Sequence, residues 1–299
     1  MKKRIVGIIL SIVLFLILDR TLGLFLNTGL EKYFGLNTHS EILLIGHSHL
    51  MLATDKQNIE KNLDCKVSKY CREGVNTIDR FHMVKQYLDS DFSDSLKVVL
   101  YGVDQFTFTS EGLSENSYML FYPFMDEENM DTYIYESAEK LEYWQHKLLT
   151  TTRYSDALLN SSIRGWMNNW SNFKFGKLDV EKLKEEVKNN AQRKIRFNSQ
   201  LKQSFEETLK LLTDRNIIVV LVNTPTAKIL NESEPEEYRK AISYFHELDS
   251  NSEKIKYLDL NDQFSDKYDL FLDDIHLNKD GQYVINMCIV NYLKNEIKL

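Results

Sequence analysis

Apolar residues fill most of the first 26 positions of the chain. After a basic start, an almost unbroken apolar run covers residues 5–18, and the polar pair Asp19-Arg20 separates it from a second run at 21–26. A membrane-spanning helix needs about 20 apolar residues, so the two runs together reach that length. No small-residue cleavage site and no lipobox cysteine follows, which favours an uncleaved signal-anchor over a removed signal peptide. We therefore predict a single-pass transmembrane helix over residues 1–26, with its amino end inside the cell and the body of the chain outside the membrane.

Five short apolar segments in the rest of the chain have the length and composition of buried strands. They cover residues 41–45, 66–70, 96–101, 216–222 and 255–260. Segments with helical spacing of apolar residues lie at about 55–63, 78–87 and 282–294. Strands that alternate with helices predict a short parallel sheet with helices on both faces. The predicted fold class is therefore α/β, a three-layer sandwich with a short parallel sheet.

Details of two helices can also be predicted. Thr54 and Asp55 are both suited to cap the amino end of the first helix after the first strand. In the closing helix, five residues are expected to face the core: Val284, Met287, Cys288, Val290 and Leu293.

Residues 106–195 interrupt the alternation of strands and helices. This stretch is rich in aromatic residues and contains all three tryptophans, with no strong strand pattern. We predict a mostly helical insertion over the carboxyl ends of the strands, where ligands of open α/β sheets bind. Alternatively, its aromatic side chains only fill the core of a small helical subdomain. The predicted organisation is the anchor, a juxtamembrane connector at 27–40, and a globular domain at 41–299 that carries the insertion.

Charge and cysteine content exclude several classes of protein. The formal net charge is −7, and because residues 1–26 contribute +3, the remainder carries −10. Such an acidic body disfavours nucleic acid as a partner. The three cysteines, Cys65, Cys71 and Cys288, form no C-x-x-C motif, which excludes a cysteine-rich zinc site. A Cys65–Cys71 disulfide could form outside the cytoplasm, and buried free thiols are at least as good an alternative. No cofactor and no metal ion are expected.

The serine at position 48 stands where a nucleophile could be presented. It follows the first predicted strand by three residues and would lie on a turn that enters a short helical segment at 50–53. A backbone amide at the start of a helix points toward negative charge, so Ser48 could supply both a nucleophile and one oxyanion donor. The alternative is a structural role, because serine is a common N-cap of helices.

Near the other end of the chain, Asp273 precedes His276 by three residues. On a turn or a first helical coil, this offset lets the carboxylate reach the imidazole, fix its tautomer and stabilise the imidazolium. Asp274 is the adjacent competitor for that position. In the structural alternative, Asp274 or Asn278 caps the last helix and His276 is exposed to solvent.

Together with two glycines, these residues form four blocks along the chain. Residues 46–49 follow the first strand, Gly74 follows the second, residues 102–104 follow the third, and residues 273–277 precede the last helix. In this order the blocks resemble the serine, glycine, Gly-x-Asn and Asp-x-x-His blocks of the SGNH/GDSL hydrolase superfamily. The resemblance covers both ends of the globular domain and leaves the insertion unmatched.

The resemblance implies the three-layer fold of that superfamily and a serine-dependent chemistry on acyl groups. It assigns Ser48 as the nucleophile, His276 as the base and Asp273 as the residue that orients the base. The backbone amides of Ser48 and Gly74 would hold the oxyanion. Four further residues are candidates for the substrate pocket: His47, His49, Gly102 and Gln105.

The chain departs from the family pattern at Asp104. The family has an asparagine there that donates to the oxyanion, whereas an ionised carboxylate cannot donate and its charge opposes an oxyanion. Asp104 could be protonated or turned away, or Asn76 or Gln105 could supply the missing donor.

This departure and the N-terminal anchor resemble the membrane-anchored branch of the superfamily. That branch includes the D-alanyl transfer protein of teichoic acid operons and the alginate acetylation proteins, which work beside membrane-bound O-acyltransferases. The resemblance implies a bacterial enzyme that takes an acyl group from a donor and passes it to a cell-surface polysaccharide. A carbohydrate or lipid esterase with the same triad is the alternative, and the sequence does not decide between transfer and hydrolysis.

Two other classes of function remain open. His47 and His49 stand two apart after a strand and could share one metal ion in a metal-dependent hydrolase, with Asp55 as the nearest carboxylate downstream. The chain could also be a non-catalytic, membrane-tethered partner or glycan-binding protein, because aromatic side chains of the insertion could stack on sugar rings.

Overall fold

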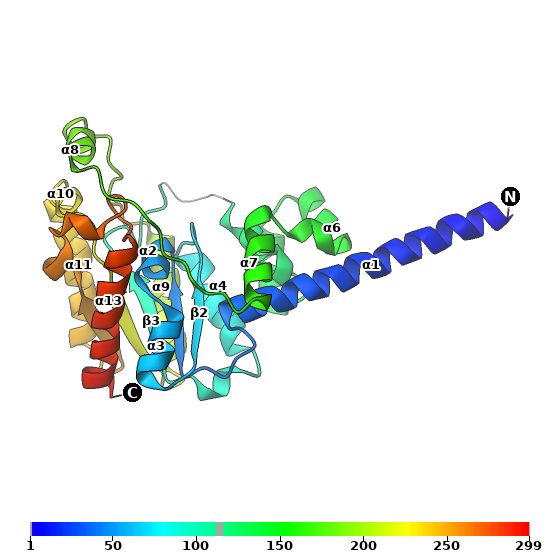
Figure 1. Ribbon diagram of the computed structural model, residues 1–299, viewed down its shortest axis with the longest axis horizontal. Helices are drawn as coiled ribbons and strands as arrows, with labels where there is room; N and C mark the ends of the chain where they lie inside the picture. Colours follow the sequence, from blue (N-terminus) through cyan, green and yellow to red (C-terminus); the bar gives the residue numbers. More distant parts are fainter. Residues whose placement is uncertain (1, 112–115, 299) are drawn as a thin grey trace. The chain divides into compact units, whose positions relative to one another are not determined.

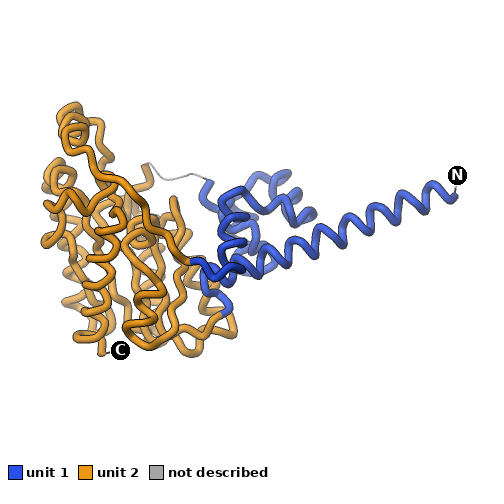
Figure 2. The backbone as a smooth tube through the Cα atoms, in the orientation of Figure 1, with its two compact units in different colours: residues 1–37, 115–169 blue, residues 38–114, 170–299 orange. Residues whose placement is uncertain are grey.

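The computed structural model describes residues 2–111 and 116–298. The chain forms two compact units, each made of segments that are distant in sequence (Figure 2). Residues 1–37 and 115–169 form unit 1, and residues 38–114 and 170–299 form unit 2. Residues 112–115 of the predicted insertion and the two terminal residues lie outside the described part of the chain.

Unit 2 contains a sheet of five parallel strands in the order β2-β1-β3-β4-β5 (Figure 1). The strands are β1 Ile42–Gly46, β2 Val67–Cys71, β3 Val98–Val103, β4 Ile218–Asn223 and β5 Ile255–Asp259. The three central strands are buried almost throughout, because a parallel sheet covered on both faces suits continuous runs of Val, Ile and Leu. The predicted α/β class with a short parallel sheet is confirmed, and each strand begins and ends within two residues of its predicted limits.

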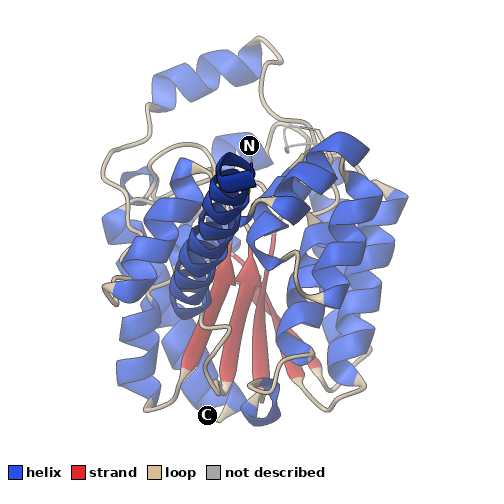
Figure 3. Ribbon diagram, turned by 90° about the vertical axis from the view of Figure 1, so that its right-hand side faces the viewer, coloured by secondary structure: helices blue, strands red, loops and turns tan. Residues whose placement is uncertain are grey.

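Helices cover both faces of this sheet (Figure 3). The helices of unit 2 are α2 Ser48–Ala53, α3 Lys56–Leu63, α4 Thr77–Leu88, α8 Val180–Lys188, α9 Ser199–Thr213, α10 Lys228–Asn231, α11 Pro235–Ser250, α12 Asn261–Phe264 and α13 Lys279–Tyr292. Short helical turns are η1 Ser93–Ser95, η4 Tyr268–Leu270 and η5 Leu293–Ile297. Adjacent residues of β3 face opposite layers. Leu100 belongs to the apolar cluster that includes Ile285 of α13, whereas the ring of Tyr101 contacts Phe205 of α9.

The two predictions about helix details had different outcomes. Asp55 is the N-cap of α3, as one of the two alternatives required. Val290 of α13 and Leu293, the first residue of η5, are buried as predicted. Three other predicted core residues are only half-buried: Val284, Met287 and Cys288. Val284 and Cys288 nevertheless pack against the core cluster, in which Ile285 and Ile289 are fully buried because packing on the sheet sets which face of the helix turns inward.

The regular elements of unit 1, among the described residues, are all helices. They are α1 Lys2–Phe34, η2 Ser117–Phe124, α5 Glu128–Ser137, α6 Lys140–Leu148, η3 Thr150–Arg153 and α7 Asp156–Trp166. Helix α1 continues well past residue 26, so most of the predicted connector at 27–40 is helical. Helices α1 and α7 approach closely where glycines meet, since a Cβ on Gly165 would overlap the carbonyl group of Gly29.

The predicted insertion at 106–195 is mostly helical, but it is divided between the two units. Its middle part packs with α1 in unit 1, and its flanking parts belong to unit 2. Within unit 2, the Ile195 amide donates to Glu234 at 2.8 Å, and the Asn278 side chain donates to the Gly176 carbonyl at 3.2 Å. Contacts between distant segments decide which residues belong to a compact unit. The periodicity of apolar residues does not reveal such contacts, so it could not predict this division.

Helix α1 is long and apolar enough to cross a membrane. Its large apolar side chains from Ile5 to Leu18 are exposed, an arrangement suited to lipid. The length and composition of α1 therefore agree with the predicted membrane attachment. The direction in which the chain crosses stays a prediction.

Candidate active site

The turn that follows β1 presents Ser48. Helix α2 begins at this residue, and the cap of the helix is His47, whose Nδ1 accepts a hydrogen bond from the backbone N–H of His49 at 3.2 Å. The Ser48 hydroxyl is therefore not the N-cap of α2, which was the structural alternative. It is available to a partner at the carboxyl end of the sheet.

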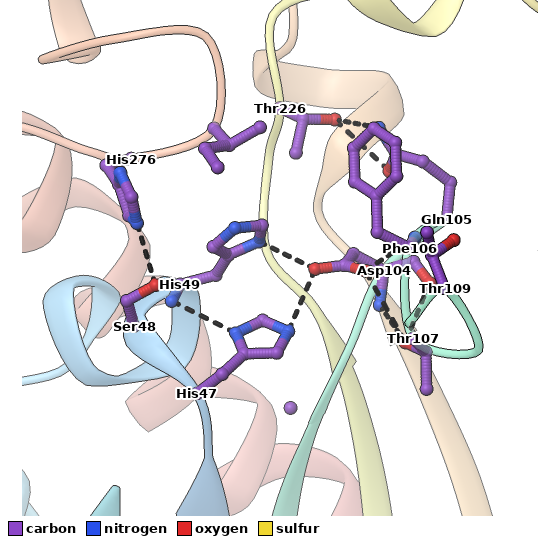
Figure 4. Close-up of polar contacts among 12 residues, drawn as sticks. His47, Ser48, His49, Asp104, Gln105, Phe106, Thr107, Thr109, Thr226 and His276 are labelled. Carbon is purple, nitrogen blue, oxygen red and sulfur yellow. Dashed lines mark hydrogen bonds and ion pairs between the residues drawn. The ribbon is translucent and has the colours of Figure 1, made fainter. Parts of the chain in front are cut away.

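That partner is His276 (Figure 4). The Nε2 atom of His276 lies 2.7 Å from Ser48 Oγ, although 228 residues separate the two in sequence. On the other side of the ring, Nδ1 of His276 lies 2.9 Å and 3.1 Å from the two carboxylate oxygens of Asp273. The structure thus brings the predicted serine, imidazole and carboxylate into one hydrogen-bonded series.

A tight loop before α13 holds the Asp273–His276 pair. The Asp273 carboxylate accepts the backbone N–H groups of Ile275 at 3.0 Å and of His276 at 2.8 Å, and the Leu272 amide donates to the His276 carbonyl. Burial would raise the pKa of Asp273, but the hydrogen bonds and charge of His276 outweigh it and lower the pKa. Asp273 is therefore ionised.

The two competing residues near His276 take other roles. Asn278 caps α13, as the structural alternative proposed, yet the His276 side chain is only 22% exposed and is bonded on both sides. Asp274 uses its carbonyl to accept the Ala227 amide at 2.8 Å. Burial, and then the neighbouring charge of Asp273, raises the pKa of Asp274.

A cavity of about 170 Å³ opens beside Ser48 and His276. Three other predicted site residues also line it, namely Gly74, His47 and His49. Gly74 lies in the turn after β2 with a φ of +78°, a conformation that glycine adopts without strain. The cavity therefore sits at the carboxyl ends of neighbouring parallel strands, the place expected for a ligand.

Besides the carboxylates Asp273 and Asp104, three predicted site residues are not among the described residues that line this cavity. Gly102 packs under Leu50, where a Cβ would lie 2.8 Å from the Leu50 Cβ. The side-chain oxygen of Asn76 accepts two backbone N–H groups as the N-cap of α4. Gln105 is buried and donates to Thr226 Oγ1 at 3.0 Å. Packing, helix capping and a buried polar network account for these residues.

Asp104, the departure from the family pattern, faces two imidazoles (Figure 4). Its Oδ2 atom lies 2.9 Å from His47 Nε2 and 2.6 Å from His49 Nδ1. Its Oδ1 atom accepts the Phe106 amide at 2.7 Å, and the residue is 1% exposed. Of the expected alternatives for Asp104, the carboxylate turned toward other partners is the arrangement found.

The negative charge of this cluster resides on Asp104. Burial would raise the pKa of Asp104, but His49 and His47 hold it well below its ordinary value. Burial, and then the neighbouring His49, lowers the pKa of His47 to about 3, so that ring is neutral. Because Nδ1 of His47 accepts a hydrogen bond, its proton sits on Nε2 and points at the carboxylate. An ionised Asp104 cannot donate to an oxyanion as an asparagine does.

The same three side chains form a candidate metal centre. One ligand atom from each of His47, His49 and Asp104 lies within 4.8 Å of the others, and two imidazoles with a carboxylate are a known zinc ligand set. Asp55 is not the carboxylate of this set, since it caps α3. Ligands at about 2.0–2.2 Å from a tetrahedral ion stand roughly 3.3 Å apart. Both nitrogens are closer than that to Asp104 Oδ2, so the spacing is that of direct contacts and an ion would need the side chains to separate.

Sequence reasoning missed two arginines that line the cavity. Arg80 on α4 is 1% exposed, donates to the Gly102 carbonyl at 2.6 Å and lies over the ring of Tyr101. Arg193 comes from the end of the predicted insertion and lies 4.8 Å from the ring centre of Phe106. Neither arginine belongs to a recognisable motif, so only the folded chain marks them as site residues.

No protein-family model and no curated protein matches this sequence. A solved protein described as an acylhydrolase, from Bacteroides fragilis, is similar with 11% identity and a TM-score of 0.42, over 86% of each chain. A family two carbohydrate esterase from Clostridium thermocellum is similar with 9% identity and a TM-score of 0.36, over 86% of this chain and 64% of that one. A lipase from a goat rumen metagenome has 15% identity and a TM-score of 0.38, over 84% of this chain and 97% of that one. These likenesses are distant, so the chemistry of the site is derived from the chain's own residues.

Proposed function

We propose that this chain is a serine-dependent acyl-transfer enzyme of the cell envelope, with Ser48 as the nucleophile. The observation that carries the proposal is the continuous series from Ser48 Oγ through His276 to the Asp273 carboxylate, which borders a cavity. A serine hydroxyl becomes nucleophilic when a positioned base takes its proton. The acyl donor is an ester or a thioester.

In the first half-reaction, Ser48 Oγ attacks the carbonyl carbon of the donor while His276 Nε2 takes the hydroxyl proton. Asp273 keeps the resting proton of the ring on Nδ1 and stabilises the imidazolium that forms. The imidazolium gives its proton to the leaving group, and an acyl ester of Ser48 remains. In the second half-reaction, an acceptor hydroxyl gives its proton to His276, attacks the ester carbonyl and releases Ser48 with its proton restored.

The backbone amides of Ser48 and Gly74 are two of the proposed oxyanion donors. We assign the third to His49, which lines the cavity and whose Nδ1 lies 2.6 Å from Asp104. Because Nδ1 of His49 faces the Asp104 carboxylate, the other ring nitrogen, Nε2, is the atom proposed to donate. In this scheme, Asp104 positions a donor in place of the family's asparagine.

The proposed acceptor is a hydroxyl group of a cell-surface polysaccharide, which makes the enzyme an O-acyltransferase. Helix α1 and the replacement at Asp104 support transfer, because both resemble the membrane-anchored branch of the superfamily. The proposed partner is a membrane-bound O-acyltransferase that supplies acyl groups, and the catalytic unit acts outside the membrane. If water is the acceptor, the same residues make an esterase.

The test is covalent labelling of the full chain in nanodiscs with a fluorophosphonate probe, followed by peptide mass spectrometry. Labelling at Ser48 that is lost in His276→Ala is expected. Folded protein that takes up no label would instead be a non-catalytic glycan-binding or partner protein. Turnover of p-nitrophenyl acetate, measured with and without an added polysaccharide, separates transfer to glycan hydroxyls from release of free acetate. Turnover that a chelator removes and zinc restores would favour the metal-dependent alternative.

A further inference from the structure

Helix α6 in unit 1 carries an apolar stripe that residues 2–111 and 116–298 leave exposed. Leu141, Trp144 and Leu148 have exposed fractions of 84%, 53% and 63%. Their spacing of three and four residues places them on one face of the helix. The adjacent face is tied to unit 1, where Tyr143 and Lys147 both bond the Asp131 carboxylate, at 2.8 Å and 2.7 Å. The stripe is therefore held in a fixed orientation, and exposed apolar surface of this kind marks a contact.

Hydrogen bonds to Asp19 and Arg20 of α1 fix the position of α6 along the length of α1. Arg20 donates to the Lys147 carbonyl at 3.2 Å. The Asp19 carboxylate accepts the amides of Thr150 at 2.7 Å and Thr151 at 2.9 Å, just beyond the end of α6. Since a helix rises 1.5 Å per residue, Arg20 stands about 3 Å beyond Leu18, where the main apolar run ends. Helix α6 thus lies beside α1 at the polar pair Asp19-Arg20, which separates the main apolar run from the shorter one at 21–26 (Figure 1).

The residues beside the stripe match the chemistry of a bilayer interface. Lys140 lies 3.4 Å from the ring centre of Tyr135, which is itself 45% exposed. Aromatic rings and the long side chain of lysine are enriched where the hydrocarbon region meets the headgroups, and Trp144 belongs to the same class. Asp19 is buried and accepts its hydrogen bonds from threonines of unit 1. Its carboxylate therefore does not need water as a hydrogen-bond partner.

We propose that α6 lies in the bilayer interface, with Leu141, Trp144 and Leu148 in contact with lipid. Lipid is the occupant because α6 is bonded to α1 next to the exposed apolar residues of that helix, and because a Lys–Tyr pair borders the stripe. Unit 1 then has two attachments to the membrane, a spanning helix and a helix lying on the surface, which restrict its rotation about α1. This inference needs α1 in a membrane and does not depend on the proposed chemistry of Ser48.

The test uses the full chain in nanodiscs of phosphatidylcholine and phosphatidylglycerol, with no other protein present. Single spin labels are placed at position 144 or 148 after replacement of the three native cysteines by alanine. Power saturation is expected to show stronger relaxation by oxygen than by a water-soluble nickel chelate at both positions. The matched control is Met167, which is 69% exposed and follows α7, the helix that meets α1 at Gly29. Gly29 is nine residues beyond Arg20, about 14 Å farther along the helix.

The control label at position 167 is expected to respond mainly to the nickel chelate. Equal access of nickel to positions 144, 148 and 167 would overturn the proposal, because the stripe would face water. Protection of 144 and 148 from both reagents would also overturn it, since that pattern belongs to a protein contact. An independent readout needs no label: brominated lipids should quench tryptophan fluorescence in Trp170→Phe but much less in Trp144→Phe. Circular dichroism of each variant checks that the fold is retained.

Discussion

Two imidazole–carboxylate groups border the same cavity and differ in how they are built. In the first, Asp273 and His276 are three residues apart, and their side chains are 45% and 22% exposed. In the second, Asp104 joins His47 and His49 from a different strand, and these side chains are 0%, 12% and 4% exposed. The more exposed pair can exchange protons with a substrate, whereas the sealed cluster keeps a fixed charge. The Asp273–His276 pair is therefore suited to proton transfer, and the Asp104 cluster is suited to holding side chains in a fixed orientation.

The largest loss of activity is expected when Ser48 or His276, the residues that react with the substrate, is replaced. Ser48→Ala or His276→Ala should lower kcat for p-nitrophenyl acetate by a factor on the order of 10⁴ or more. The double variant should lose little beyond either single variant, because the two residues act as one unit. Thermal unfolding should stay near that of the unmodified chain. Substantial turnover by Ser48→Ala would remove Ser48 from the mechanism.

Replacement of the carboxylate of this pair should cost less. Asp273→Asn is expected to lower kcat by roughly 10² to 10⁴, since the amide can no longer stabilise the imidazolium or fix its tautomer. The neighbouring Asp274→Asn is the matched control, and it should stay within about threefold of the unmodified enzyme because it keeps the size of the side chain and the backbone carbonyl that accepts the Ala227 amide. Equal losses in the two variants would show that the assignment of Asp273 as the orienting residue is wrong.

The sealed cluster should show a smaller catalytic effect. Asp104→Asn is expected to lower kcat about 10²-fold with little change in KM, as the loss of one oxyanion donor does. The reason is that the anchor of His49 loses its charge. In a His49→Ala background, the same Asp104→Asn change should add little, which a double-mutant cycle measures. Esterase activity that is preserved or raised in Asp104→Asn would show that the carboxylate is only a drifted oxyanion residue.

The smallest expected effect is on the pH dependence of the free energy of unfolding, to which the buried His47 contributes. The pKa of His47 falls from 6.5 to about 3 on folding, so below pH 6.5 the unfolded chain binds a proton that the folded chain does not. The contribution of His47 to stability is therefore full above pH 6.5 and is lost as the pH falls toward 3, at about 1.4 kcal/mol per pH unit. His47→Gln, which keeps a donor toward Asp104, should flatten this slope in urea unfolding. An unchanged slope would contradict a neutral, buried His47.

Several parts of this arrangement could be predicted because their causes are local. Continuous apolar runs of five or six residues locate buried parallel strands, and the turn after such a strand locates Ser48. The offset of three between Asp273 and His276 already allows their contact within one loop. The apolar run of α1 predicts a membrane span from its length and composition alone.

Other features depended on partners that are distant in sequence. No local pattern places Asp104 between His47 and His49. That contact arises because β1 and β3 are neighbours in the sheet, so that their carboxyl ends meet. The burial of Gln105 and the cavity position of Arg193 likewise follow from packing between distant segments.

From its own order of residues, this chain determined the strands, the membrane-length helix and the two local fragments of the catalytic series. Tertiary structure decided which side chains became neighbours: the 2.7 Å contact of Ser48 with His276, the charge on Asp104 and the division of the aromatic segment between two units. The two kinds of feature depend on interactions that act over different distances along the chain. Periodicity and turn chemistry act over a few residues, whereas burial, desolvation and charge pairing depend on everything that packs around a group.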